Sequence, residues 1–141
     1  MSEESWEYTL HIPNDPRAVA VCRHTLRLVL AAHGLPHLSA DAELLGTELV
    51  TNAVTHTKGP VALRVRWSGA VLRVGTWDAE PTPGPPRAVE VREGGGDAEG
   101  GRGLALVRAY ADDWGWHRLR YAGKYVWCEL AGRAPEPGSV A

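Results

Sequence analysis

The 141-residue sequence has no apolar run that approaches the length of a membrane-spanning helix. Such a helix needs about 20 consecutive, mostly apolar residues, so we expect no contact with a membrane. The stretch from Met1 to Ser5 is acidic and lacks the basic segment followed by an apolar one that is typical of a signal peptide. These absences predict a cytoplasmic protein.

A strong excess of one charge is also missing. The 15 lysines and arginines nearly balance the 17 aspartates and glutamates, which gives a formal net charge of −2. Proteins that bind nucleic acid directly carry a basic patch or stripe, so the charge balance gives no reason to expect direct nucleic-acid binding. Phenylalanine is absent although six tryptophans are present, and we interpret this as compositional bias of the genome.

Cysteine is scarce: Cys22 and Cys128 are the only two, and they form no CxxC pair. Zinc sites and catalytic dithiols generally use closely spaced ligands. Because each cysteine lies among apolar residues, we interpret both as small buried side chains rather than as metal ligands or a redox centre.

What remains is the composition of one globular domain, with 44% hydrophobic and 23% charged residues. Helical spacing of apolar residues predicts a first helix from Arg17 to Ala32, with Asp15 as its N-cap. A second helix should follow Ser39, also an N-cap, and end before Lys58. Alternating apolar and polar residues predict five strands: Trp6–Ile12, Val61–Trp67, Ala70–Trp77, Trp114–Arg120 and Lys124–Leu130.

Residues 79–100 are rich in proline and glycine, which argues against regular structure. A linker between domains is one interpretation, but the remaining chain of roughly 40 residues is too short for a second independent domain. Long loops inside compact domains are usually functional or disordered, so we favour a mobile lid. A third helix should open at Gly101, and the tail from 132 to 141 should be disordered.

The second predicted helix carries three polar residues at intervals of four: Glu48, Asn52 and His56. Each step of four residues advances roughly 40° around a helix, so the three side chains share one face. For an arbitrary helix, a solvated polar face would be the better explanation of this pattern. An amide oxygen such as that of Asn52 suits Mg²⁺, and a carboxylate such as Glu48 suits proton transfer or a metal-bound water.

Two further features lie downstream. Asp78 follows a predicted strand, and a carboxylate is a good acceptor for an exocyclic amine such as that of adenine. The glycine-rich stretch Gly101-Arg102-Gly103 leads into the third predicted helix, where backbone N–H groups and the helix dipole favour phosphate oxygens. Each feature is a weak signal by itself, because short glycine motifs and strand-end aspartates are common.

Together, these features resemble the three sequence boxes of the GHKL (Bergerat-fold) family of histidine-kinase-like ATPases, in their order and spacing. The matching segments are Glu48 to His56, Trp77 to Pro81 and Gly101 to Leu104. Within that family the chain looks most like the small ATP-binding regulators of actinobacteria that are related to anti-sigma-factor serine/threonine kinases. The resemblance implies a histidine-kinase-like ATPase domain at residues 1–131, followed by the tail at 132–141.

The resemblance also implies the fold and the site. The fold would be an α/β two-layer sandwich, with a mixed, mostly antiparallel sheet of about five strands and three helices on one face. ATP and Mg²⁺ would be the cofactors, with Glu48 as the catalytic base and Asn52 as the Mg²⁺ ligand. The other implied nucleotide-binding residues are His56, Asp78, Gly101, Arg102, Gly103 and Leu104.

The chain departs from the family pattern in two places. The second box commonly continues with two glycines, whereas Glu80 and Pro81 follow here, and a proline there is typical of the small regulators. In the serine kinases a lid arginine reaches the γ-phosphate just before the third box, whereas residues 97–100 contain none here. The candidates for that contact are Arg87, Arg92 and Lys124.

Two functions follow from the resemblance. The leading one is a kinase that transfers the γ-phosphate of ATP to a serine or threonine of an anti-anti-sigma-type partner and sequesters a sigma factor. The alternative is an ATP-dependent protein-binding switch with little or no phosphotransfer. A sensor histidine kinase core is disfavoured, because no phosphoacceptor helix precedes the expected ATP domain. The oligomeric state stays open, a homodimer included.

Overall fold

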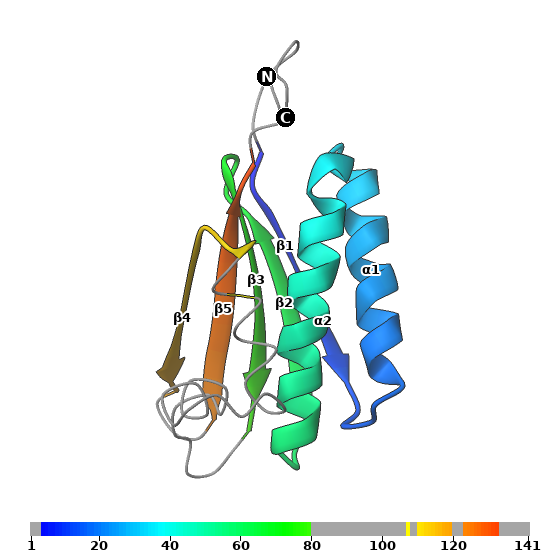
Figure 1. Cartoon of the computed structure of the whole chain (residues 1–141), viewed down its shortest axis with the longest axis vertical. Coiled ribbons are helices and arrows are strands. Elements are labelled where there is room, and N and C mark those ends of the chain that lie inside the picture. The colour runs from blue at the N-terminus through cyan, green and yellow to red at the C-terminus, as the bar shows by residue number, and fades with distance from the viewer. Residues whose placement is uncertain (1–3, 80–106, 108–109, 120–122, 133–141) are drawn as a thin grey trace.

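A five-stranded sheet with two long helices on one of its faces makes up the described part of the molecule (Figure 1). The computed structural model describes residues 4–79, 107, 110–119 and 123–132. The prediction of a two-layer α/β sandwich with five strands is confirmed.

The sheet has the strand order β1-β2-β3-β5-β4, and all four described pairings are antiparallel. β2 and β3 form a hairpin, in which the Ser68 hydroxyl accepts hydrogen bonds from the N–H groups of Ala70 and Val71. The strand bounds are β1 Trp6–Ile12, β2 Val61–Trp67, β3 Val71–Asp78, β4 Asp113–Arg118 and β5 Lys124–Ala131. Each lies within two residues of its predicted position.

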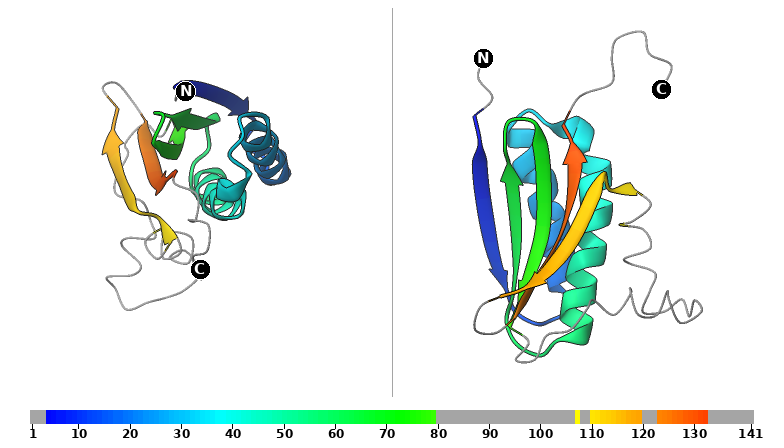
Figure 2. Two further views of the ribbon diagram at one scale, coloured as in Figure 1. Left: turned by 90° about the horizontal axis from the view of Figure 1, so that it is seen from above. Right: turned by 90° about the vertical axis from the view of Figure 1, so that its left-hand side faces the viewer.

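The helices are α1 (Ala18–Ala32) and α2 (Ser39–His56), joined through the short 3₁₀ helix η1 (Pro36–Leu38). Both long helices lie on the same side of the sheet, as the view along the strands shows (Figure 2). α2 packs against β2, β3 and β5, and α1 packs mainly against α2. α2 is therefore the helix that connects the two layers at the centre of the sheet.

The core lies between the helices and the covered face of the sheet. Alternate residues of β2 and β3 point into it, among them Leu63, Val65, Leu72 and Val74, and all four are buried. Gly46 lies where α2 meets α1, because a Cβ there would come within 2.4 Å of Leu26 Cδ1. This glycine therefore allows the two helices to approach closely.

The predictions that Asp15 and Ser39 are N-caps are wrong, because the N-cap residues of α1 and α2 are Arg17 and Leu38. α1 begins at Ala18, and the Asp15 carboxylate instead accepts a hydrogen bond from the N–H of Arg17 at 2.8 Å. This two-residue turn is a common alternative for aspartate before a helix. α2 begins at Ser39 itself, whose hydroxyl donates to Glu43 at 2.5 Å rather than capping the helix.

The third predicted helix and the lid predicted at 79–100 lie mostly outside the described residues, and so does most of the tail. Val107 and Tyr110 are described and helical, and the Ala111 N–H donates to the Val107 carbonyl at 2.9 Å, which is a helical hydrogen bond. Val107 is completely buried. Two long helices, rather than three, are therefore complete within the described residues.

Both cysteines are free and fully buried, as the sequence predicts. Burial raises the pKa of the Cys22 thiol to about 11 and that of the Cys128 thiol to about 12. Both groups are therefore protonated at neutral pH, and thiols in this state are poor nucleophiles and poor metal ligands.

No helix in the described part is long and apolar enough to cross a membrane.

Two leucines of α1 give a matched test of this packing. Leu26 is fully buried between the helices, whereas Leu28, two residues later, is 70% exposed. We expect Leu26→Ala to lower the free energy of unfolding by about 2–5 kcal/mol through the cavity it leaves, and Leu28→Ala to change it by at most about 0.5 kcal/mol. Urea denaturation followed by circular dichroism measures both, and equal effects would contradict the packing described here.

Candidate functional site

The three polar residues predicted to share a helix face lie in the second half of α2. Glu48, Asn52 and His56 are each partly buried, whereas Leu49, Val50 and Ala53 between them are buried in the core. The helical prediction for this stretch is therefore correct, and the three side chains lie at the border of the buried apolar stripe. His56 is the last residue of the helix.

Asp78 is the last residue of β3 and is only 2% exposed. It lies opposite Val61 in the hairpin, and Val61 points into the core. Residues directly opposite each other in an antiparallel pair point to the same face of a sheet. The Asp78 carboxylate therefore lies on the face covered by α2, two residues beyond the buried Thr76.

The C-terminal ends of α2 and β3 meet at one end of the molecule (Figure 1). A Cβ on Gly59, in the turn after α2, would be 3.4 Å from Ala79 Cβ, the residue after Asp78. Asn14 holds this turn, because its side-chain amide donates to the carbonyls of Thr57 at 2.9 Å and Gly59 at 3.1 Å. The polar end of α2 and the buried aspartate therefore belong to one region of the structure.

Asp78 forms an ion pair with a lysine from a neighbouring strand. Lys124 is the first residue of β5 and lies directly opposite Asp78 in the β3–β5 pairing. Its Nζ is 3.0 Å from Asp78 Oδ2, with the side chains 12% and 3% exposed, respectively. The pair is thus nearly removed from solvent, which is costly for two charges unless each partner stabilises the other.

Gly123, the residue before this lysine, packs closely against the backbone of Asp78. Gly123 has a φ of +99°, and a Cβ there would be 2.2 Å from the carbonyl oxygen of Asp78. Only glycine adopts this conformation readily and also leaves room for the contact. Gly123 therefore sets where β5 begins, and with it the position of Lys124 opposite Asp78.

The remaining predicted site residues belong to the third sequence box and to the segment before it. Gly101, Arg102, Gly103 and Leu104 lie outside the described residues, and so do Arg87 and Arg92, two of the three candidates for the lid arginine. The third candidate, Lys124, is bound to Asp78. The ion pair between this lysine and Asp78 is not predicted by the sequence.

The side chains of the α2 face are suitable for Mg²⁺ but do not form a site by themselves. In the described part of the chain, no group of three or more histidine, cysteine, aspartate or glutamate residues is placed to hold a metal ion. Mg²⁺ usually takes one or two protein oxygens and completes its shell with water and substrate phosphates. The oxygens of Asn52 and Glu48 fit this pattern.

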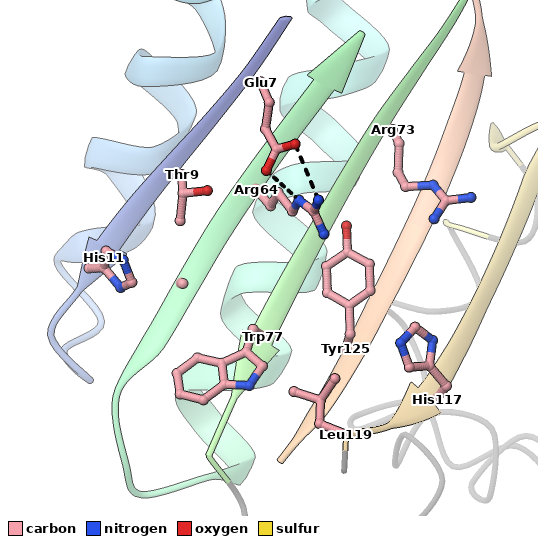
Figure 3. Close-up of a pocket in the computed structure, with 10 residues that line it drawn as sticks. Glu7, Thr9, His11, Arg64, Arg73, Trp77, His117, Leu119 and Tyr125 are labelled. Carbon is pink, nitrogen blue, oxygen red and sulfur yellow. Dashed lines mark hydrogen bonds and ion pairs between the residues drawn. The ribbon is translucent and has the colours of Figure 1, made fainter. Parts of the chain in front are cut away.

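A different cavity lies on the opposite, uncovered face of the sheet (Figure 3). Its volume is about 470 Å³. None of the residues predicted to bind nucleotide lines it. The lining residues come from all five strands and the segment after β4: Glu7, Thr9, His11, Ala62, Arg64, Arg73, Trp77, His117, Leu119 and Tyr125.

The arginines of this cavity are already paired. Arg64 Nε is 2.8 Å from a Glu7 carboxylate oxygen, and Arg73 Nη2 is 2.7 Å from Glu129 while its guanidinium lies 4.1 Å from the centre of the Trp127 ring. The Tyr125 ring lies over Gly75, where a Cβ would be 2.5 Å from it. The Tyr125 hydroxyl is buried without a hydrogen-bond partner among the described residues, and burial raises the pKa of Tyr125.

Comparison with known proteins identifies a family. The model of the histidine kinase-like ATPase domain matches residues 12–129. The match therefore includes both long helices, the polar face of α2, Asp78 and Lys124. A search of curated proteins found no match.

Proposed function

Because the chain belongs to the histidine kinase-like ATPase family, we propose that it binds ATP between α2 and the end of β3, as a regulator that acts on partner proteins. The observation that carries this proposal is the buried Asp78 on the helix-covered face of the sheet. A buried carboxylate with a specific charged partner, here Lys124 at 3.0 Å, is a candidate functional group.

In this proposal the Asp78 carboxylate accepts a hydrogen bond from the amino group of adenine. The triphosphate then extends along α2 toward Asn52 and Glu48, and Gly101 to Leu104 bind its phosphates. His56, at the end of α2, lies near the base or the phosphates. A hydrogen bond to a charged group is worth about 1.5–3 kcal/mol, which corresponds to roughly a tenfold to a hundredfold change in affinity.

Mg²⁺, when bound, neutralises charge on the phosphates and orients them. Asn52 would hold it through its amide oxygen, as the resemblance to the family implies. The chemistry of the donor supports this assignment, because the carboxamide of Asn52 supplies the kind of hard oxygen ligand that Mg²⁺ prefers.

The finer proposal is kinase activity toward an anti-anti-sigma-type partner, together with binding of a sigma factor. Glu48 would take the proton of a partner's serine or threonine hydroxyl while its oxygen attacks the γ-phosphorus. The bond from that phosphorus to the bridging oxygen breaks, and ADP leaves. The alternative is a switch that binds its partner only with ATP bound. It is favoured by residues 97–100, which contain no arginine for the γ-phosphate.

ATP binding is tested by calorimetry with Mg-ATP. We expect saturable binding with one nucleotide per chain, and at least a tenfold loss of affinity for Asp78→Asn, because the amide presents one acceptor oxygen and a competing donor. Asp41→Asn is the matched control, since Asp41 is exposed in the first turn of α2. Undetectable binding by the wild type would refute the proposal.

Phosphotransfer is tested with γ-labelled ATP and purified candidate partners. If the protein is a kinase, label passes to a partner, and Glu48→Ala reduces the rate by about 10²-fold or more while ATP binding is retained. Asp41→Ala removes a carboxylate from the same helix outside the predicted site and should leave the rate unchanged. Transfer to no partner, together with ATP-dependent complex formation, would identify a switch instead.

A further inference from the structure

The cavity on the uncovered face of the sheet follows one row of residues that crosses all five strands (Figure 3). Residues opposite each other in antiparallel pairs point to the same face. The cross-strand register therefore places these side chains next to one another: His11, Ala62, Trp77, Tyr125 and His117. Ala62 has the smallest side chain, so the row is lowest between His11 and Trp77. The cavity volume of about 470 Å³ is typical of small-molecule sites.

The walls of this cavity are largely aromatic and apolar. The Trp77 indole, the Tyr125 ring and the Leu119 side chain all line it. The His117 and Tyr125 rings lie 5.7 Å apart between their centres, with 58° between the ring planes. Side chains of this kind bind a flat aromatic molecule by stacking and by apolar contact. The lining therefore matches a ligand with a planar ring system.

Tyr125 also brings an unsatisfied polar group to this cavity. The residue is only 6% exposed, and its hydroxyl has no hydrogen-bond partner among the described residues. The Arg64 guanidinium lies beside the hydroxyl (Figure 3), but a guanidinium has only donors and cannot accept the hydroxyl proton. Burial raises the pKa of Tyr125, so the hydroxyl keeps its proton at neutral pH. A ligand oxygen would supply the acceptor that this buried group lacks.

Arg64 has donors left for the same ligand. Its Nε and Nη2 donate to the two carboxylate oxygens of Glu7, at 2.8 Å and 3.2 Å. A guanidinium has five N–H donors, so the Glu7 pair does not use the two protons of Nη1. The side chains of Arg64 and Glu7 are 40% and 41% exposed, and such an exposed ion pair contributes little to stability. The guanidinium can therefore turn toward a second carboxylate without disrupting the fold.

We propose that this cavity binds small aromatic carboxylates, with the ring against Trp77 and the carboxylate between the Arg64 guanidinium and the Tyr125 hydroxyl. Arginine recognises carboxylates through its planar fork of donors, and Glu7 already occupies one edge of the Arg64 guanidinium in this way. The site is separate from the proposed nucleotide site, because Asp78 lies on the other face of the sheet.

The test is a titration of the ¹⁵N-labelled full chain with 2-naphthoate, followed by NMR, with 2-naphthamide as a neutral compound of the same shape. We expect saturable binding of 2-naphthoate, with the largest amide shifts around Ala62 and Trp77. The amide should bind about fivefold more weakly or less well still, because hydrogen bonds to a charged oxygen are roughly twice as strong as those to a neutral one.

Two arginines of β2 give a matched pair of variants. Arg64→Met removes the proposed carboxylate contact and should weaken 2-naphthoate by about tenfold or more. Arg66→Met removes the same charge from an exposed position of the same strand that does not line the cavity, and should leave the affinity unchanged. Circular dichroism checks that both variants are folded.

Two further variants separate binding from stability. Tyr125→Phe should weaken 2-naphthoate by about threefold or more. It should not lower the free energy of unfolding, because the hydroxyl makes no hydrogen bond to the described residues. Glu7→Gln removes the carboxylate that competes for Arg64, and should therefore tighten 2-naphthoate binding by about twofold or more.

Several results would overturn this proposal. They are the absence of saturable 2-naphthoate binding up to about 10 mM, equal affinity for the carboxylate and the amide, and an Arg64→Met variant that binds as tightly as the wild type. ATP binding by the same samples is measured separately. Loss of the naphthoate result would leave the proposed function intact, and a failure to bind ATP would leave the naphthoate result standing.

Discussion

The packing of α2 against the centre of the sheet is the contact on which the rest of the structure depends. Leu45, Leu49 and Val50 of this helix are buried, and the helix packs against β2, β3 and β5 as well as against α1. Their burial leaves Glu48, Asn52 and His56 at the border of the interface, where side chains are partly exposed. The same helix covers Asp78, and the low dielectric under it makes a charge there expensive unless it is paired.

The two faces of the sheet consequently have different chemistry. The covered face is apolar except near its end, where Asp78 and Lys124 form their ion pair. On the uncovered face, the charged side chains are arranged in cross-strand pairs such as Arg64 with Glu7. That face contains a cavity of about 470 Å³, but its arginines are already paired with carboxylates. The nucleotide site that we propose lies on the covered face, at the end where Asp78 is buried.

Much of this fold could be predicted from the sequence, because short-range patterns determine it. Alternation located all five strands, and helical spacing located α1 and α2. The pairing of β3 with β5 could not be predicted, since these strands are separated by a long segment without a clear pattern. Lys124 was therefore considered for the phosphate end, whereas the cross-strand register places it beside Asp78. The N-cap positions were missed because aspartate and serine form several local turns with similar sequences.

The central claim is that the nucleotide binds on the helix-covered face, at the end where α2 and β3 meet. The most direct measurement is a titration of ¹⁵N-labelled protein with Mg-ATP, followed by NMR. We predict shifts of the backbone amides around Asn52, Asp78 and Lys124, with the amides of Glu7 and Arg73 on the far part of the uncovered face unchanged. Shifts concentrated at Glu7 and Arg73, with those around Asp78 unaffected, would contradict the account.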